Sequence, residues 1–545
     1  MRLLHLKLLS KFRGLAPETE FIFDNGEQVK EKIEPICLVG VNGSGKSNLM
    51  EVIAEIFYYL ELYKSSSKKT DKRHQTRFGF EISYELNLNL QAAKVSWEKF
   101  AKLSFETKDT VKVTVKKQPK QIPTITLSVK EKIYVENNSD PDYFILPLHV
   151  ISYSSGQNEL ISNPFIRTNY HYFDELNSEK SRNISEELDL SRLFHIDYEA
   201  SKLITISNYL FARKNNVDMI SEEVEVDDLD SFSIVIRSRN YRNNKIEFAG
   251  IIQKSIEDLK SCATTFEEKN GEANFRELKL SYKVDDEMRR AFENSFGSAI
   301  RLYSSLFFLN VMNIHCHPKE TRDKIKNSGS LDDNLSYLIP VPPRERLVFI
   351  VEKVKFKKQG EKEPIKYKNL SDGEHQLMHV LGSIMLLNLS GSILLFDEPE
   401  THFNPEWRSQ LITFINKAAS EKNKVDKFRE QEIIISSHSP FIVSDCRRER
   451  VFVFEKGGKA TNPSINTFGT SVNILTEEIF KKTESISGQS MEKIEEIKKL
   501  PLTTPAEIET AKEASRVLGE SVEKVLLFRE FIIRENELKG NDKKL

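Results

Sequence analysis

Short apolar runs recur along the chain, and each ends in small, polar or charged residues. Such runs lie at residues 36–39, 144–153, 393–396 and 433–435, and each has the length of a buried strand. Strict alternation of apolar and polar residues at 111–115 and 125–129, around a Lys- and Pro-containing turn, predicts an antiparallel hairpin. A second hairpin is predicted for residues 2–8 and 21–23. The pattern is that of an α/β protein.

Apolar residues with helical spacing follow several of the predicted strands. The clearest helical patterns cover residues 48–57, 199–212, 251–263 and 286–309. Residues 353–366 are rich in charge and contain Gly360, which predicts a charged loop. The tail from Met491 is charged and helical, with one apolar stripe that could pack on its own head domain or dock a partner. That stripe comprises Val517, Leu518, Val522, Val525, Leu526 and Phe528.

These patterns divide the chain into four parts. We expect an N-terminal lobe at 1–160, an inserted, mainly helical subdomain at 161–335, a C-terminal lobe at 336–475 and a helical tail at 476–545. A length of 545 residues is ample for two or more hydrophobic cores.

Composition narrows the class of protein. The formal charge of −2 differs from the strong positive charge typical of nucleic-acid-binding proteins, but it does not exclude a local basic face. The four cysteines lack CxxC spacing, which argues against a zinc ribbon or a disulfide scaffold and favours a reducing, cytoplasmic compartment. No apolar run approaches the length of a membrane span, and no signal peptide is predicted.

One glycine-rich segment carries strong chemical information. Residues 40–47, Gly-Val-Asn-Gly-Ser-Gly-Lys-Ser, fit the phosphate-binding pattern G-x-x-x-x-G-K-[ST] between a predicted strand and a predicted helix. Backbone N–H groups in such a loop surround phosphate oxygens, the lysine reaches the outer phosphates, and the serine hydroxyl holds Mg²⁺. We therefore predict ATP binding, with Mg²⁺ on Ser47. The predicted ATP contacts here are Gly40, Asn42, Gly43, Ser44, Gly45, Lys46, Ser47 and Asn48.

A second group of motifs lies after residue 370. Leu370-Ser371-Asp372-Gly373-Glu374 opens an apolar helix, and is explained either as an anion site or as a simple capping box. The run 393–396 ends in Asp397-Glu398, which suits a Mg²⁺-ordering carboxylate beside a base that activates water. The run 433–435 leads to His438, an imidazole that can sense the terminal phosphate.

Two further candidates stay open. Arg13, between the strands of the hairpin predicted at residues 2–8 and 21–23, is as compatible with a nucleotide contact as with a solvated strand end. The residue types of His315-Cys316-His317 suggest metal binding, but three ligands this close in sequence cannot all reach one ion without unusual strain.

Together these motifs resemble the ABC-type ATPase head of the SMC/RecF class. In that class they are Walker A, Q-loop, signature, Walker B and H-switch, here at Gly40–Ser47, Gln157, Leu370–Gln376, Leu394–Glu398 and His438. The resemblance implies that Gln157 and Asp397 contact Mg²⁺, and that Glu398 and His438 are catalytic. It also implies that Ser371, Gly373 and Glu374 bind ATP on an opposing subunit in a head-to-head dimer. Asp372 replaces a glycine that is more usual in the family signature.

Within that class, three short segments are similar to PtuA ATPases of Septu and retron-associated antiphage defence systems. The segments are 153–159, 398–402 and 467–471. This resemblance implies an HNH nuclease acting in trans and, in retron variants, a reverse transcriptase with its RNA–DNA hybrid. Two alternatives are a RecF-like DNA-repair ATPase and an OLD-type ATPase–nuclease. The second is disfavoured because no Toprim pattern, a strand ending in Asp-x-Asp, follows residue 475.

Overall fold

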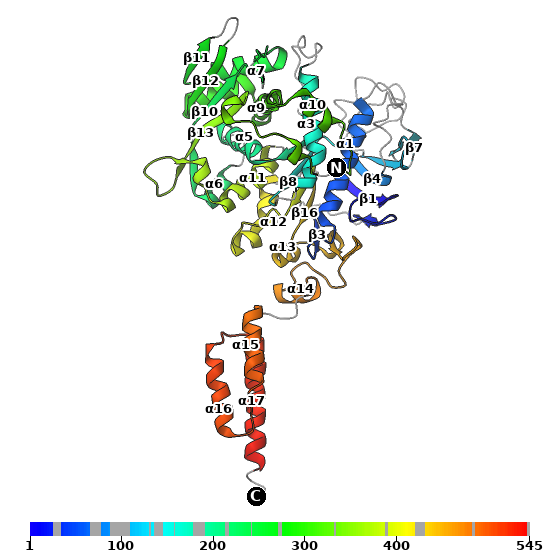
Figure 1. The fold of residues 1–545 in the computed structure, drawn as a ribbon, viewed down its shortest axis with the longest axis vertical. Coiled ribbons are helices and arrows are strands. Elements are labelled where there is room, and N and C mark those ends of the chain that lie inside the picture. Colours follow the sequence, from blue (N-terminus) through cyan, green and yellow to red (C-terminus); the bar gives the residue numbers. More distant parts are fainter. Residues whose placement is uncertain are drawn as a thin grey trace.

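The chain folds into a head built on three β-sheets, with a helical unit at the C-terminal end (Figure 1). The computed structural model describes residues 1–24, 34–65, 78–87, 110–129, 132–135, 145–156, 159–177, 191–212, 217–240, 242, 244–270, 275–331, 334–386, 391–419, 431–481 and 486–541. The fold class is α/β, as the sequence predicts.

The central sheet positions the candidate site. Its seven strands lie in the order β18-β17-β3-β16-β15-β8-β9, and every pairing except that of β18 is parallel. Every residue of β3, β15 and β16 is buried, which explains the apolar runs at 36–39, 393–396 and 433–435 within them. The strands are β3 (Ile36–Gly40), β8 (Val150–Ser154), β9 (Leu193–Ile196), β15 (Ile393–Asp397), β16 (Glu432–Ser436), β17 (Val451–Phe454) and β18 (Ala460–Thr461).

A consequence of this order is that four predicted motifs share one sheet edge. The neighbours β3, β16, β15 and β8 run parallel, so their carboxyl ends lie together. Walker A follows β3, His438 follows β16, Asp397 ends β15, and Ser155 and Gly156 follow β8.

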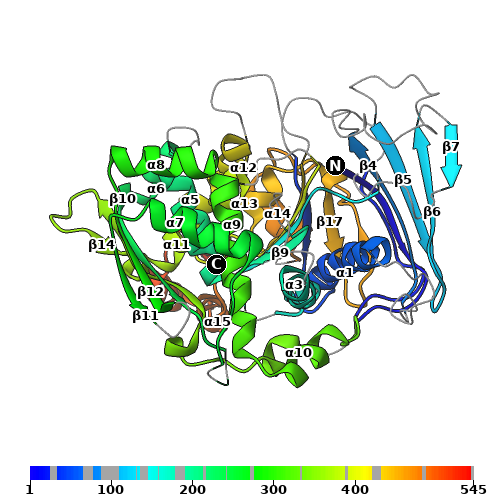
Figure 2. The same ribbon diagram turned by 90° about the horizontal axis from the view of Figure 1, so that it is seen from above.

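An antiparallel sheet of six strands and helix α1 (Lys46–Ser65) form the rest of the N-terminal lobe, on one side of the head (Figure 2). Both predicted hairpins are confirmed, as β1 with β2 and as β5 with β6. Residues 102–107, whose alternation of apolar and polar residues also predicts a strand, lie outside the described residues. The strand order is β2 (Glu20–Ile22), β1 (Arg2–Leu8), β4 (Phe80–Asn87), β5 (Thr110–Lys117), β6 (Thr124–Val129) and β7 (Lys132–Val135).

The insertion is rich in helices, as expected, but it also contributes strands that the sequence analysis did not single out. One of them, β9, extends the central sheet. The predicted helix at 286–309 is two helices, because Gly297 has a left-handed φ of 72° and ends the first. The helices are α3 (Asn163–Leu176), α5 (Tyr198–Leu210), α6 (Asp218–Val224), α7 (Gly250–Ser261), α8 (Asp286–Phe296), α9 (Ala299–Val311) and α10 (Lys319–Lys326).

A third, antiparallel sheet crosses the expected boundary at residue 335. Its order is β11 (Thr265–Asn270), β12 (Phe275–Lys283), β10 (Val226–Arg237), β13 (Phe349–Lys358) and β14 (Ile365–Lys366). The interpretation of 353–366 as a charged loop is therefore wrong for most of its length. Its lysines lie on a strand with one polar face, where charge does not oppose β-structure.

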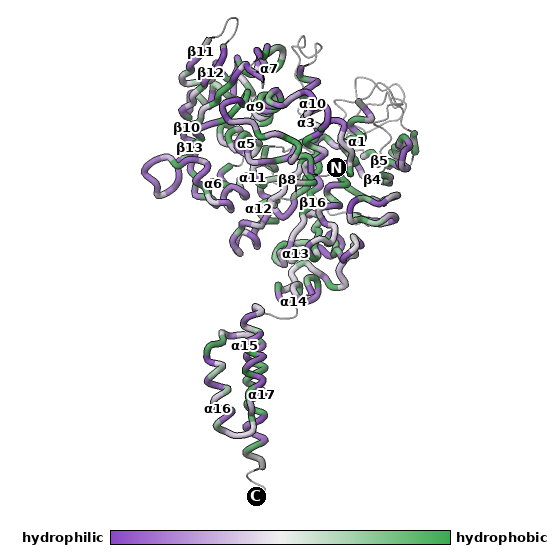
Figure 3. The backbone as a smooth tube through the Cα atoms, viewed as in Figure 1, coloured by the Kyte–Doolittle hydropathy of each residue, from purple (hydrophilic) through white to green (hydrophobic). Residues whose placement is uncertain are grey.

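Helices α11 (Asp372–Leu386), α12 (Pro405–Ala419) and α13 (Pro440–Ser444) complete the C-terminal lobe. Hydrophobic residues concentrate on the strands and helices inside the head (Figure 3). One buried core joins the C-terminal lobe to the insertion, and a second core lies under α1 and the six-stranded sheet.

Beyond α14 (Val472–Glu478), the tail projects from the head as a unit of three helices (Figure 1). These helices are α15 (Gly488–Lys498), α16 (Pro505–Ala514) and α17 (Val522–Asn541). They share a small core of Ile497, Ile508, Ala511, Leu527 and Phe531. Most of the predicted apolar stripe instead faces outward, since Val517, Val522, Val525 and Leu526 are all more than half exposed.

Candidate active site

The Walker A loop connects β3 to α1 in a conformation that depends on glycine. Gly40 has a φ of 140°, and a Cβ there would lie 2.3 Å from the backbone oxygen of Phe454. Gly45 has a φ of 109° and packs against Leu15 and Gly458. L-residues rarely adopt such backbone angles, so the glycines allow the loop to wrap inward and present N–H groups.

Lys46 lies inside the loop that it is expected to serve. Its Nζ donates hydrogen bonds to the carbonyl oxygens of Gly40 at 3.0 Å and Val41 at 3.3 Å. Burial lowers the pKa of this ammonium, against the opposing influence of Glu398 and Asp397. The side chain is thus a desolvated cation held by neutral carbonyls, which a phosphate oxygen can replace as a stronger partner.

Ser47, in the first turn of α1, contacts Asp397 at the end of β15. The Ser47 hydroxyl donates to Asp397 Oδ1 at 3.2 Å, and the Ser436 hydroxyl binds the same oxygen. Burial raises the pKa of Asp397, while these two hydroxyls lower it. A buried carboxylate beside a serine hydroxyl at the end of the P-loop fits Mg²⁺, which takes few protein ligands and keeps water and phosphate oxygens. The residues present therefore suit the predicted ion.

Glu398 adopts a left-handed backbone conformation, with a φ of 50°. Its amide donates to the Ser436 carbonyl at 3.2 Å, and its Oε1 lies 3.4 Å from His438 Nε2. The pKa of Glu398 is lowered, first by hydrogen bonding to His438 and also by the charge of Lys46. An ionised carboxylate oriented by an imidazole is suited to accept a proton from water.

Lys46, Ser47, Asp397 and Glu398 line one hollow of about 290 Å³, whose lining does not include His438. Asp397, Glu398 and Gly156 line it together with the Walker A residues Asn42, Gly43, Ser44, Gly45, Lys46, Ser47 and Asn48. The volume and the lining suit the phosphate end of a nucleotide. Gln157, predicted to contact Mg²⁺, lies outside the described residues.

Arg13 does not line this hollow. Its guanidinium binds the carboxylate of Glu51 on α1, with Nη2 donating to Oε1 at 2.9 Å, and Nη1 donates to the Leu331 carbonyl at 3.3 Å. The Arg13 side chain is only 16% exposed, so it is not a solvated strand end, and its contact with a nucleotide stays a prediction. The arginine instead compensates a buried carboxylate in the helix that starts with Lys46.

The signature segment faces a different surface. Ser371, Gly373 and Glu374 line a hollow of about 480 Å³ with Asn404 and Trp407, and this hollow shares no lining residue with the P-loop pocket. A Cβ at Gly373 would lie 2.9 Å from the His402 carbonyl, so the motif needs glycine for this close approach.

Glu374 has a local role. Its Oε2 accepts the Ser371 N–H at 2.6 Å, its own N–H donates to Ser371 Oγ at 3.3 Å, and Lys358 binds its other oxygen. This is the capping box that the sequence allows. The predicted contact of Glu374 with ATP on an opposing subunit stays a prediction.

Two residues near the candidate site were not among the predicted site residues. Gln376, buried in α11, donates to the Glu398 carbonyl at 3.3 Å and accepts the His402 N–H at 2.8 Å, which ties the signature helix to the segment after Walker B. Glu400 is buried, and burial raises its pKa to about 7. Gln376 is the last residue of the signature segment, and Glu400 follows Walker B by two residues, so their position in or beside a motif was the available signal.

The cluster at 315–317 does not converge on an ion. His317 Nδ1 lies 2.8 Å from the Tyr170 hydroxyl, Cys316 Sγ donates to the Arg346 carbonyl at 3.0 Å, and the His315 ring packs on Phe173. Across the described ranges, no group of three or more His, Cys, Asp or Glu side chains is arranged to hold a metal.

In the same part of the chain, none of the helices combines the length and apolarity needed to cross a membrane.

The chain is similar to a short part of one curated protein in sequence and to several solved structures in fold. A curated relative, Protein ea59 of Escherichia phage lambda, is 30% identical over 100 residues, which span only 18% of each chain. Among solved structures, an SMC head bound to the C-terminal winged-helix domain of ScpA covers 86% of this chain and 98% of its own, at 12% identity and a TM-score of 0.32.

Two further structures show the same pattern. The SMC head domain from Thermotoga maritima covers 85% of this chain and 100% of its own, at 10% identity and a TM-score of 0.30. The recombination mediator protein RecF with ATP covers 84% and 98%, at 12% identity and a TM-score of 0.28.

The family assignment rests on a longer match. Residues 153–444, more than half of the chain, fit one family profile, and this range holds the end of β8, the signature, Walker B and His438. The chain therefore belongs to the P-loop ATPase family described as "AAA domain, putative AbiEii toxin, Type IV TA system".

Proposed function

We propose that this chain binds ATP with Mg²⁺ in the P-loop hollow and hydrolyses it there. The observation that carries the proposal is the contact between Ser47 Oγ and Asp397 Oδ1 at 3.2 Å, in a hollow that Lys46 and Glu398 also line. Walker A supplies the cation and the N–H groups, and Walker B supplies the carboxylates.

Each residue has a distinct task in this proposal. Backbone N–H groups of the loop and the Lys46 ammonium hold the phosphates. Glu398 accepts a proton from the attacking water, while His438 orients the carboxylate and stays near the terminal phosphate. Ser47 and Asp397 would hold Mg²⁺, which supplies charge neutralisation for the phosphate oxygens.

We further propose that catalysis requires two copies of the chain. Ser371 and Gly373 lie in their own surface hollow, apart from the P-loop pocket of the same chain. A two-fold pair would place each signature segment against the nucleotide of its partner, so that two ATP molecules close the interface.

The finer proposal is that this ATPase is the regulatory subunit of an antiphage defence complex. It would control an HNH nuclease supplied by another chain, and in retron variants a reverse transcriptase. The support is the resemblance of three segments to PtuA proteins, together with a tail whose apolar residues stay exposed. The nucleotide state would set whether the nuclease is held or released.

The first test is ATP binding by the Lys46→Ala chain, measured by calorimetry against the parent chain. Loss of the ammonium should abolish binding because the phosphates lose their charge partner. Retention of the parent affinity would overturn the P-loop assignment.

The regulatory proposal has its own test. The purified chain, free of partners, is incubated with DNA and with RNA in the presence of Mg²⁺ or Mn²⁺. No cutting is expected without an added nuclease, and cutting that a site variant of this chain abolishes would refute the proposal.

A further inference from the structure

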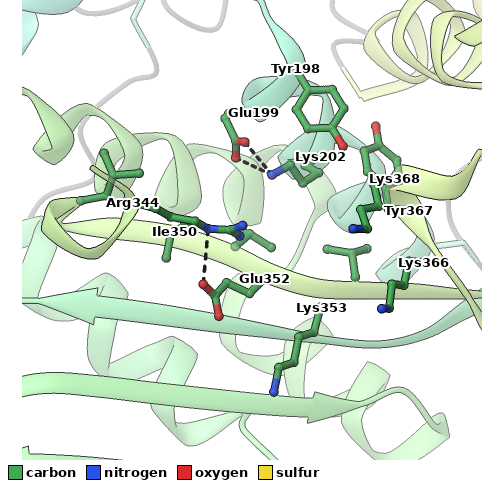
Figure 4. Close-up of a pocket in the computed structure, with 13 residues that line it drawn as sticks. Tyr198, Glu199, Lys202, Arg344, Ile350, Glu352, Lys353, Lys366, Tyr367 and Lys368 are labelled. Carbon is green, nitrogen blue, oxygen red and sulfur yellow. Dashed lines mark hydrogen bonds and ion pairs between the residues drawn. The ribbon is translucent and has the colours of Figure 1, made fainter. Parts of the chain in front are cut away.

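A basic hollow lies on the five-stranded sheet, apart from the P-loop. Its volume is about 480 Å³, and it is formed by the start of α5, the residues before β13, β13 itself and the segment that follows β14 (Figure 4). Its lining has five basic and two acidic side chains, although the chain as a whole is slightly acidic. The basic residues are Lys202, Arg344, Lys353, Lys366 and Lys368.

The acidic residues neutralise only two of these cations. Lys202 Nζ lies 2.6 Å from a Glu199 oxygen, and Arg344 Nε lies 3.5 Å from Glu352 Oε1 (Figure 4). Within the part of the chain that the structure describes, no carboxylate lies within 4.0 Å of the ammonium of Lys353, Lys366 or Lys368. Three exposed lysines therefore present uncompensated positive charge to the same hollow, which is the arrangement that attracts a multivalent anion.

The backbone of β13 is distorted where it meets the hollow. Between the pairs Ser231–Lys355 and Ser233–Glu352, one residue of β10 opposes two residues of β13. Lys353, at this bulge, has a left-handed φ of 52°, a conformation that non-glycine residues rarely adopt. Bulges redirect side chains out of the regular alternation and are frequent next to binding sites. Here the bulge allows five consecutive residues, 350–354, to line one hollow.

Aromatic and apolar groups complete the lining. Tyr198 is 45% exposed, and its ring lies 5.8 Å from that of Tyr367. Leu347, Ile350 and Val354 supply an apolar surface beside the charges. An exposed aromatic ring beside several cations is the combination that binds a nucleobase by stacking and its phosphate by charge.

The hollow also borders the signature helix. The rings of Tyr198 and Tyr367 pack on His375 in α11, with centroids 5.7 and 4.5 Å away. Lys368, on the rim, precedes Ser371 by only three positions. A ligand in the hollow would therefore touch the residues that lead into the signature segment.

We propose that this hollow is a second nucleotide-phosphate site, separate from the ATPase pocket. Its ligand is a base stacked on Tyr198 with its phosphate on Lys353, Lys366 and Lys368. That chemistry can come from a free nucleotide or from one unit of a single strand of nucleic acid.

The test uses the full-length Lys46→Ala chain, in which the P-loop no longer competes for nucleotide. Two probes are titrated, thymidine monophosphate and a short fluorescent oligothymidylate, over a series of salt concentrations. Binding of the monophosphate identifies a free-nucleotide site, and binding of the oligomer alone identifies a strand site. Binding of neither probe overturns the proposal.

Two sets of variants assign the binding to this hollow. Charge reversal of Lys353, Lys366 and Lys368 to Glu should reduce the slope of log affinity against log salt by about 0.7, since the three lysines share one phosphate and each neutralised phosphate on a single strand contributes roughly that amount. Tyr198→Ala should weaken binding by roughly tenfold, while Tyr198→Phe should retain it, because the stacking surface survives.

A matched control reverses three other exposed lysines, Lys319, Lys324 and Lys456. The control has the same net charge as the test variant but keeps the hollow intact. Equal loss of binding in both triple variants, at equal unfolding midpoints, would show non-specific attraction and overturn the proposal. Unchanged binding after reversal of the three lysines in the hollow would do the same.

Discussion

Replacing Glu400 with Gln should stabilise the protein at alkaline pH, although it removes a charged residue beside the active site. Glu400 is 5% exposed, its Oε1 accepts the Ser437 hydroxyl, and its Oε2 has no hydrogen-bond partner among the described residues. Burial raises its pKa from 4.5 to about 7, and the nearby Glu398 charge adds to this effect. The ionised form therefore destabilises the fold.

The sign and size of the effect follow from the pKa. The folded chain holds the Glu400 proton between pH 4.5 and about 7, where an unfolded chain releases it. The stability from this group is complete below pH 4.5 and is lost as pH rises through 7. A difference of about 2.5 pKa units corresponds to about 3 kcal/mol, at 1.36 kcal/mol per unit.

The assay is urea unfolding of the parent and the Glu400→Gln chain from pH 5 to pH 8. The difference in unfolding free energy should shift in favour of the glutamine variant by about 2.5 kcal/mol over that range, because part of the effect is already lost at pH 5. Glu495→Gln, a change at an exposed helix position, serves as the control and should shift little. A constant difference between parent and Glu400→Gln would show that Glu400 is ionised throughout, and would refute the reasoning.

Three further predictions concern catalysis, assembly and the tail. Glu398→Gln should lower ATP turnover by roughly 10²- to 10⁴-fold, the usual contribution of a general base, while calorimetry shows ATP binding preserved. Ser371→Arg, at an exposed position, should abolish ATP-dependent pairing in light scattering while each chain still binds ATP; a pair that forms as before would contradict the signature assignment. Phe531→Ala should destabilise the three-helix unit by about 3–5 kcal/mol, seen as faster hydrogen exchange within 488–541. Faster exchange in the head as well would show that the tail supports it.

The sequence predicted that Walker A and Walker B residues lie together because these motifs are short and contiguous, and in the structure they line one hollow. Walker A and Walker B each combine a buried strand with the chemistry at its carboxyl end, so the fold and the site follow from one pattern. The Ser47–Asp397 contact joins residues 350 positions apart, yet the parallel order of β3, β16 and β15 makes it expected. By contrast, the partner of Arg13 was not predictable, since nothing local to Glu51 marks it as the residue that faces the first hairpin.

The third sheet was missed for a physical reason. β13 carries Glu352, Lys353, Lys355, Lys357 and Lys358 among its ten residues, which resembles a solvated loop more than a strand. The strand is stable because β10 pairs with it along its length and buries the alternate apolar residues. Long-range pairing of this kind overrides local composition and leaves no signal in the segment itself.

Gln376 suggests how the two halves of the ATPase machinery communicate within one chain. Its amide binds the backbone of Glu398 and His402, while the same helix begins at the signature segment and its capping box. If the Glu398 backbone moves, then either these hydrogen bonds break or Gln376 moves with it. Water cannot replace the bonds, because Gln376 is only 2% exposed. Glu398 also holds a left-handed backbone conformation, which a change in the Walker B segment could release. Gln376→Leu should consequently uncouple ATP binding from pairing, so that each chain binds ATP with parent affinity but the pair forms no more readily with ATP than without it. Light scattering with and without ATP measures this difference, and unaltered ATP-dependent pairing would assign the coupling to another contact.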